Sequence, residues 1–233
     1  AAQRLFPRAS FDLIYARPNQ TPDAWASELS AALDLGPQHM SLYQLTIEPD
    51  TPFYKHQASG KLTLPDEDSA ADMYEITQSL CASAGLPAYE ISNHGADGHA
   101  CRHNVASWQG GDYLGIGPGA HGRVTSLEKR ARLSSVAHRS PTEWLAHVED
   151  QGHGWAEQQA LDSESVEMEA VLLGLRLVEG VGLDALAARG IDLDAARLAK
   201  LREQGLLSPN TARLQASPEG RLILDHLIGQ LLA

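Results

Sequence analysis

The chain has 233 residues, of which 43% are hydrophobic, and its 30 acidic and 18 basic side chains give a net charge of −12. This length suits one large domain, or one domain with a small appendage. The acidic balance argues against nonspecific binding to a nucleic-acid backbone. The sequence contains no apolar run long enough to predict a transmembrane segment, and no basic-then-apolar signal peptide at its start.

The sequence has two cysteines, Cys81 and Cys101. Two cysteines without a secretion signal predict a reducing cytoplasm rather than a disulfide framework. Their separation matches no zinc or iron–sulfur spacing, so we do not expect this chain by itself to hold a cluster on cysteines. The chain opens without a methionine and soon enters a buried-looking strand, which suggests that a further segment precedes it.

The first half alternates strand-like and helix-like segments. Thr21 and Pro22 are typical of the N-cap and first residue of a helix, and Gly36 and Gly85 are typical of helix ends. In chain order we predict a strand at 11–15, a helix at 22–35, a strand at 39–47, a helix at 66–84, and strands at 88–92 and 113–116. This order predicts right-handed βαβ units and a parallel sheet.

Ligands of parallel sheets bind at the carboxyl ends of the strands. Asp12 and Glu90 stand between apolar residues, and a carboxylate in such a place is costly unless it is paired or bound to something. A hydrogen bond to a neighbouring loop is the structural alternative. The residues that we expect on or near the ligand-binding side are Asp12, Glu48, Glu90, Gly117, Gly119 and His121.

Residues 99–122 contain three histidines, a cysteine, a tryptophan and six glycines. Imidazole and thiolate ligate iron or zinc, and glycine lets the backbone approach a ligand closely. This composition predicts a ligand-binding loop, although a turn-rich connection with exposed histidines would look similar. A zinc site on His99, Cys101 and His103 lacks a convincing fourth ligand.

The glycines of the same segment could also form a phosphate cradle. Gly115, Gly117, Gly119 and Gly122 follow the strand expected at 113–116, but their spacing is not the G-x-G-x-x-G that opens a helix. We therefore prefer a place for them at the mouth of a barrel.

After Gly122 the pattern changes to a polar hairpin at 123–136 and a helix from Ser140–Pro141 to about residue 149. Further helices are expected at 163–179, 183–188 and 193–204, then two short strands around Pro209–Asn210 and a last helix from about Ser217. Met168 and the leucines around it have the spacing of a helical core face. The arrangement from 163 onward resembles a winged helix. With 7 basic and 10 acidic residues its net charge is −3, which favours a lid or partner-docking module over nucleic-acid binding.

Several motifs together resemble the HemW family of radical S-adenosylmethionine (SAM) haem chaperones. The similarity extends from about residue 10 to the end, and the segments that carry it are residues 11–15 (FDLIY), 41–52 (SLYQLTIEPDTP), 89–93 (YEISN), 101–104 (CRHN) and 113–122 (YLGIGPGAHG).

The resemblance implies an α/β fold, a partial (β/α) barrel. Residues 1–122 would form the later half of the radical SAM barrel, residues 123–160 a hairpin and helix connection, and residues 161–233 the small winged-helix-like C-terminal domain of the HemN/HemW type. In that family a [4Fe–4S] cluster on a Cys-x3-Cys-x2-Cys loop binds SAM, and both would belong to a segment upstream of residue 1. Radical chemistry is therefore not expected from this chain as it stands.

The resemblance also implies roles for single residues. Asp12 matches a strand position that offers a polar group to the adenosine of SAM. The family's haem-binding motif His-Asn-x-x-Tyr-Trp corresponds to His103, Asn104 and Trp108, with Ser107 in place of the tyrosine. His103 would ligate the haem iron. A second departure is residues 16–20, Ala-Arg-Pro-Asn-Gln, where the family usually has Gly-Leu-Pro-Gly-Gln.

The function implied is that of a cytoplasmic haem chaperone that delivers haem to haem-dependent apoproteins, respiratory enzymes among them. The alternative is an oxygen-independent coproporphyrinogen III dehydrogenase, which decarboxylates two propionates by radical chemistry. Porphyrinogen carboxylates need basic partners, and residues 1–122 hold 6 basic against 14 acidic side chains, which favours the chaperone.

A third hypothesis, an interaction module without a ligand, predicts no spectral response to haem. The sequence leaves open the haem acceptor, the oligomeric state and any peripheral membrane association.

Overall fold

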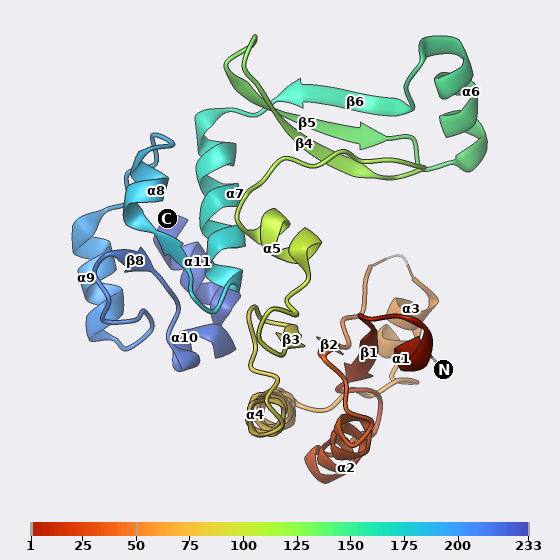
Figure 1. Ribbon diagram of the computed structural model, residues 1–233, viewed down its shortest axis with the longest axis vertical. Helices are drawn as coiled ribbons and strands as arrows, with labels where there is room; N and C mark the ends of the chain where they lie inside the picture. Colours follow the sequence, from red (N-terminus) through yellow and green to blue (C-terminus); the bar gives the residue numbers. More distant parts are fainter. Residues whose placement is uncertain (1, 50, 233) are drawn as a thin grey trace. The chain divides into compact units, whose positions relative to one another are not determined.

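A computed structural model describes residues 2–49 and 51–232 of the chain (Figure 1). The chain divides into two compact units, one ending at Cys101 and the other beginning at Arg102. Each unit is described by itself below. Among the described residues, none of the helices combines the length and the apolar character that crossing a bilayer requires.

The first unit is a three-stranded sheet with helices. Strands β1 (Ser10–Tyr15) and β2 (His39–Gln44) are parallel, and β3 (Asn93–Gly95) is antiparallel to β2 in the order β1-β2-β3. The helices of this unit are α1 (Ala2–Leu5), α2 (Pro22–Leu33), α3 (Pro52–Ala58) and α4 (Glu67–Ser83). The strands expected at 11–15 and 39–47 and the helices expected at 22–35 and 66–84 are confirmed, with ends shifted by one to three residues.

Side-chain caps explain where the two long helices begin. The Thr21 hydroxyl accepts a hydrogen bond from Ala24 N (3.2 Å), and the Asp66 carboxylate accepts one from Ser69 N (2.8 Å). Each cap satisfies an amide that has no partner within its helix. Pro22 occupies the first turn of α2, where its missing amide hydrogen is not needed.

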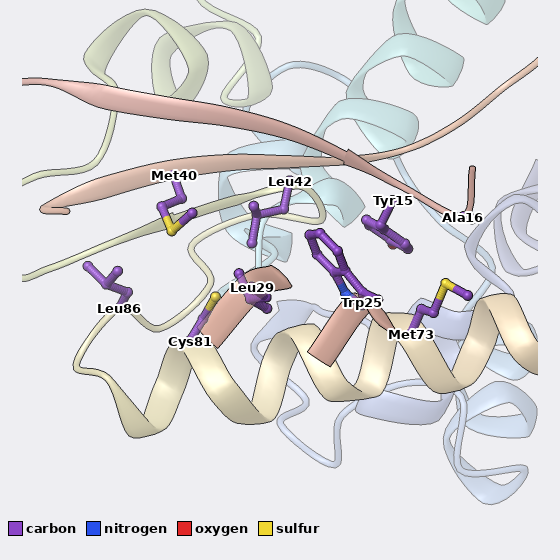
Figure 2. Close-up of a cluster of buried hydrophobic side chains, with 9 residues drawn as sticks. All are labelled: Tyr15, Ala16, Trp25, Leu29, Met40, Leu42, Met73, Cys81 and Leu86. Carbon is purple, nitrogen blue, oxygen red and sulfur yellow. The ribbon is translucent and has the colours of Figure 1, made fainter. Parts of the chain in front are cut away.

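The core of this unit lies between the sheet and α2 and α4 (Figure 2). Tyr15 stacks on Trp25 with ring centroids 5.2 Å apart, and the buried Trp25 indole donates to the Thr77 hydroxyl at 2.8 Å. Phe11 and Leu13 pack against the same cluster. Because side chains alternate along a strand, Ser10 and Asp12 of β1 project from the opposite face of the sheet.

Two strand predictions are wrong. Residues 88–92 do not form a third parallel strand, because the Glu90 carboxylate accepts hydrogen bonds from Ser92 N (3.1 Å) and from the Asn93 amide and so bends the chain. Only after this bend does β3 pair with β2, in the antiparallel direction. Residues 113–116 do not form a strand either, since Tyr113 makes one isolated bridge to Arg123. Leu114 and Ile116 are 73% and 85% exposed, so no core stabilises an extended strand there.

The second unit combines a sheet with a helical part. Strands β4 (His121–Ser126), β5 (Ala131–Ala137) and β6 (Trp155–Ala160) form an antiparallel sheet, and α6 (Pro141–Gln151) connects β5 to β6. The hairpin and the helix expected here are confirmed. The remaining elements are α5 (Arg102–Trp108), α7 (Ser163–Arg176), β7 (Val181–Gly182), α8 (Leu183–Ala187), α9 (Ala195–Glu203), β8 (Arg213–Leu214), α10 (Pro218–Leu222) and α11 (Leu224–Leu232).

The helical part differs from its prediction in a helix end and in strand pairing. Helix α7 ends at Arg176 rather than at residue 179, because Leu177 is extended and buried. Leu207 and Ala216 pair in an isolated bridge around the turn at Pro209–Asn210, while β8 pairs with β7. Helix α11 buries Leu224, Leu227, Ile228 and Leu231, which share one face of the helix.

Candidate functional site

The second unit contains a cavity of about 520 Å³ bordered by α5, β4 and α7. This volume lies within the range of about 300–1,000 Å³ that is usual for small-molecule sites. Figure 1 shows α5 beside the yellow-green connection to β4, with α7 next to it. The lining residues are His103, Asn104, Ser107, Trp108, Tyr113, Arg123, Met168, Glu169, Leu172 and Leu173.

One face of α5 supplies four of these side chains. His103 and Ser107 are four residues apart, as are Asn104 and Trp108, and that spacing places each pair on neighbouring turns of one face. The three haem-binding candidates His103, Asn104 and Trp108 are therefore brought together in one pocket, and Ser107 lies among them.

The surroundings of His103 favour one tautomer. Its Nδ1 lies 3.3 Å from Asn104 Oδ1, and Ser107 Oγ donates to the His103 carbonyl at 2.9 Å. An amide oxygen only accepts, so Nδ1 donates in this contact, and in the neutral imidazole Nε2 then carries the lone pair. His103 is exposed, so that lone pair is accessible to a metal centre carried by a ligand.

Trp108 forms an aromatic wall of the cavity. The guanidinium carbon of Arg176 lies 4.5 Å from the centroid of its ring, a cation–π distance. The indole Nε1 is buried and has no hydrogen-bond partner within the described part of the chain. The arrangement presents the tryptophan as a flat apolar surface, held in place by a cation.

Helix α7 contributes an apolar rim. Met168 and Leu172 are 45% and 40% exposed. The expectation that Met168 and all its neighbouring leucines are core is therefore wrong, because this side of α7 faces the cavity instead of other helices. Exposed apolar side chains beside a tryptophan suit a flat, apolar ligand.

Charged residues at one side of the cavity form an ion-pair network. Arg123 Nε donates to Glu169 Oε1 at 2.7 Å, and Arg123 Nη2 lies 2.6 Å from the same oxygen. Arg132 Nε lies 3.7 Å from Glu169 Oε2, and Arg132 Nη1 lies 3.3 Å from Asp112. The hydrogen bond to Glu169 raises the pKa of Arg123, and a backbone hydrogen bond from Thr125 lowers the pKa of Asp112.

The sequence prediction missed six pocket residues, namely Tyr113, Arg123, Met168, Glu169, Leu172 and Leu173. Arg123 and Glu169 are 46 positions apart and meet only because β4 and α7 come together. An arginine directly after a glycine-rich loop was a weak signal for Arg123. The sequence carries no comparable signal for Glu169, which looks like any acidic residue on an amphipathic helix.

The first unit contains Asp12, at the start of a chain of hydrogen bonds. Ser10 Oγ lies 3.2 Å from Asp12 Oδ1 and 2.8 Å from His39 Nδ1, while His39 Nε2 lies 2.9 Å from the Tyr89 hydroxyl. The Tyr89 hydroxyl also accepts from Cys101 N at 3.3 Å.

The Asp12 end of this chain fixes its direction. A carboxylate only accepts, so Ser10 donates to Asp12, and the Ser10 oxygen accepts from the Nδ1–H of His39. Burial, as the largest cause, lowers the pKa of His39 and so favours the neutral ring, whose Nε2 accepts from the Tyr89 hydroxyl. One oxygen of Asp12, Oδ1, is thus occupied by Ser10, and Oδ2 is left for other partners.

The remaining predicted residues lie in varied settings. Glu90 is fully buried and hydrogen-bonded to Ser92 and Asn93, which agrees with the structural alternative for it. Glu48 is exposed in the loop after β2, so it follows the carboxyl end of that strand as expected. Gly117 and Gly119 have φ of +106° and +71°, values that favour glycine, and His121 is exposed at the start of β4.

In the described parts of the chain, no group of three His, Cys, Asp or Glu side chains lies close enough together to hold a metal ion. His99, Cys101 and His103 therefore form no such group. The Cys81 thiol is buried in α4, and this burial raises its pKa to about 12. A thiol held protonated in this way is a poor ligand for iron or zinc.

Comparisons with known proteins agree with the fold. Residues 161–223 match the model of the HemN C-terminal domain. The solved structure of coproporphyrinogen III oxidase (HemN) from Escherichia coli, a radical SAM enzyme, superposes with a TM-score of 0.73 at 19% identity, over 98% of this chain and 56% of that one. At this identity the likeness shows the fold alone. It confirms the prediction of part of a radical SAM barrel followed by a small C-terminal domain.

Curated relatives match along the whole chain. It is 34% identical to radical S-adenosyl methionine domain-containing protein 1, mitochondrial, of Bos taurus, over 100% of this chain and 55% of that protein. It is also 34% identical to heme chaperone HemW of Synechocystis sp., over 96% of this chain and 58% of that protein. The chain thus spans somewhat more than half the length of these relatives, and along that span it is similar to the HemN and HemW radical SAM proteins.

Proposed function

We propose that this chain carries the haem-binding site of a haem chaperone. The observation that carries the proposal is the cavity of the second unit, where an accessible imidazole, a tryptophan face and an apolar helix rim line one space. A tetrapyrrole needs these features: an axial ligand for its iron and flat apolar walls for its ring. The name of the Synechocystis relative, a heme chaperone, supports the same assignment.

His103 would ligate the iron through Nε2. Asn104 would hold the imidazole in the required tautomer by accepting from Nδ1, at the observed 3.3 Å. Trp108 would lie against the macrocycle, as would Met168 and Leu172. The exposed side of the pocket would leave part of the haem accessible to an acceptor apoprotein, which we propose as the partner.

In the whole protein we propose that SAM and a [4Fe–4S] cluster are also bound, as the radical SAM family implies. The two cysteines of this chain do not fit the cluster, since Cys81 is buried with a raised pKa. Asp12 fits a role toward SAM, because its Oδ2 can accept from a ribose hydroxyl or an adenine amino group. We place the protein in the cytoplasm, although the bovine relative is named mitochondrial.

A haem titration tests the proposal. The purified chain is titrated with haemin and with iron-free protoporphyrin IX, and the Soret band is followed for the wild type and for His103→Ala. We expect a saturable Soret shift with haemin that His103→Ala weakens at least tenfold, because an iron–nitrogen bond is lost. Protoporphyrin IX has no iron, so its binding should change little in the same variant.

His226→Ala provides the matched control. His226 is exposed on α11, where it contacts Gln230 at 2.8 Å, and it does not line the cavity. Unchanged haemin binding in that variant, together with a loss in His103→Ala, supports iron ligation by His103. Equal binding by the wild type and His103→Ala would rule this assignment out, and absence of any Soret response would rule out haem binding by the chain.

The alternative function, decarboxylation of coproporphyrinogen III, gains one argument from the structure. The scarcity of basic residues in 1–122 speaks against carboxylate binding, but Arg123, the next residue, lines the cavity. A product assay separates the two: the full-length protein is incubated with coproporphyrinogen III and SAM under reducing, anaerobic conditions. Formation of a decarboxylated tetrapyrrole would contradict a function limited to carrying haem.

A further inference from the structure

Arg123 has a definite position in the wall of the cavity. Its side chain is fixed through Nε and Nη2 by the Oε1 atom of Glu169, at 2.7 and 2.6 Å, and its Nη1 donates to the Gly122 carbonyl at 3.0 Å. The side chain is 20% exposed, and it lines the cavity.

Two of the five N–H groups of the Arg123 guanidinium are not used in these contacts. Arginine has five N–H donors. The contacts to Glu169 use Nε–H and one N–H of Nη2, along one edge of the planar group, and the contact to Gly122 uses one N–H of Nη1. One N–H on each of Nη1 and Nη2 remains. Two adjacent N–H groups of this kind match the two oxygens of a carboxylate.

The cavity wall holds one acid beside this base, Glu169, and its carboxylate is already engaged by Arg123. Glu169 orients Arg123 before any ligand arrives, which reduces the entropy lost on binding.

We propose that Arg123 is the receptor for a carboxylate of the bound tetrapyrrole, a haem propionate. This inference rests on the proposed function and adds the group that selects the ligand. The apolar walls and His103 recognise the ring and the iron, while Arg123 recognises the acid side chain and sets which edge of the ring faces β4. Glu169 acts as a positioning residue, because it holds the guanidinium without touching the ligand.

The test compares haemin with haemin dimethyl ester, in which both propionates are esterified and uncharged. Soret titrations are made with the wild type, Arg123→Gln and Arg132→Gln. We expect the wild type to bind haemin about tenfold more tightly than the ester, as a charge-assisted hydrogen bond implies. Arg123→Gln should bind the two ligands within about twofold of each other, while binding the ester as the wild type does.

Arg132→Gln is the matched control, since Arg132 belongs to the same ion-pair network but lines a second cavity of about 290 Å³. It should keep the preference for haemin. If Arg123→Gln fails to fold by circular dichroism, Arg123→Lys replaces it, and this variant should lose most of the preference because it lacks the planar pair of donors.

The outcomes separate the two proposals. Equal binding of haemin and its ester by the wild type, or an undiminished preference in the Arg123 variants, overturns the role of Arg123 and leaves haem binding intact. If neither ligand produces a Soret shift with the wild type, the proposed haem function fails, and the carboxylate receptor fails with it.

Discussion

Ala16, at the carboxyl end of β1, has a φ of +55°, and Asn19 in the same turn has a φ of +61°. Both stand where the resemblance to HemW places glycine, which adopts this conformation without steric strain. Asparagine tolerates it better than most residues, but alanine does not. The Arg17 guanidinium pairs with Glu28 of α2, and Gln20 donates to the same carboxylate at 3.2 Å, so side-chain contacts hold the strained turn in place.

Substitutions at Ala16 should separate strain from packing. Ala16→Gly relieves about 1–2 kcal/mol of left-handed strain. The gain is offset by the loss of a buried methyl group, about 0.8 kcal/mol, and by about 0.5–1 kcal/mol of added chain entropy. We therefore expect the free energy of unfolding to change by less than about 1 kcal/mol in urea denaturation. Ala16→Val should lower it by more than about 2 kcal/mol, because a β-branched side chain hardly fits a positive φ. A valine variant as stable as the wild type would contradict the strained turn.

At the scale of single elements, helix α5 shows how a seven-residue segment prepares a site. Its pocket face carries His103, Asn104, Ser107 and Trp108, and the position of Ser107 is where the family motif has tyrosine. The Ser107 hydroxyl donates a hydrogen bond to the His103 carbonyl within the helix, so this side chain adds little surface to the cavity.

Ser107→Tyr should therefore strengthen haem binding. A second aromatic ring beside Trp108 would contribute about 0.5–1.5 kcal/mol of contact, which corresponds to about two- to tenfold in affinity. Haemin titration of the variant measures the change. Ala106→Tyr, at an exposed position of α5 outside the cavity, is the control and should leave the affinity unchanged. Weaker binding by Ser107→Tyr would mean that the cavity has no room for the ring.

The elements also show which parts of the fold were predictable. Helices α2 and α4 follow from local signals, since Thr21 and Asp66 act as caps whatever the rest of the chain does. Strand β3 was not predictable, because its direction and start depend on the Glu90 side chain bonding to residues that follow it. The pocket residues of α5 could be predicted from the sequence, because they belong to one contiguous motif. The pocket residues of β4 and α7 could not, because Arg123, Met168 and Glu169 come together only through tertiary packing.

At the scale of the whole molecule, the two units carry different chemistry. The first unit buries His94 completely, and this burial, with a smaller effect from His39, lowers the pKa of His94 to about 4. The unfolded chain binds a proton at this residue near its model value of 6.5. Between these two values the unfolded state holds more protons than the folded state, so stability falls as the pH is lowered.

We expect the free energy of unfolding of the first unit to be independent of His94 above about pH 7 and to fall by up to about 3 kcal/mol between pH 6.5 and 4. Trp25 reports on this unit, because its indole donates to Thr77 within the core. Its NMR resonance is followed during urea denaturation at several pH values. His94→Gln should flatten the pH dependence in this range. An equally steep dependence in that variant would assign the effect to other groups.

The exposure of the cavity rim has a consequence for kinetics. His103 is exposed and Met168 and Leu172 are nearly half exposed, so a bound tetrapyrrole would be enclosed on one side only. A ligand that leaves without any part of the protein having to open dissociates quickly, and differences in affinity between related sites arise mainly from this rate. Such a site has a short residence time, and an acceptor can approach the free edge while the ligand is still held. Under the proposed function, these properties suit a protein that passes haem on rather than one that stores it.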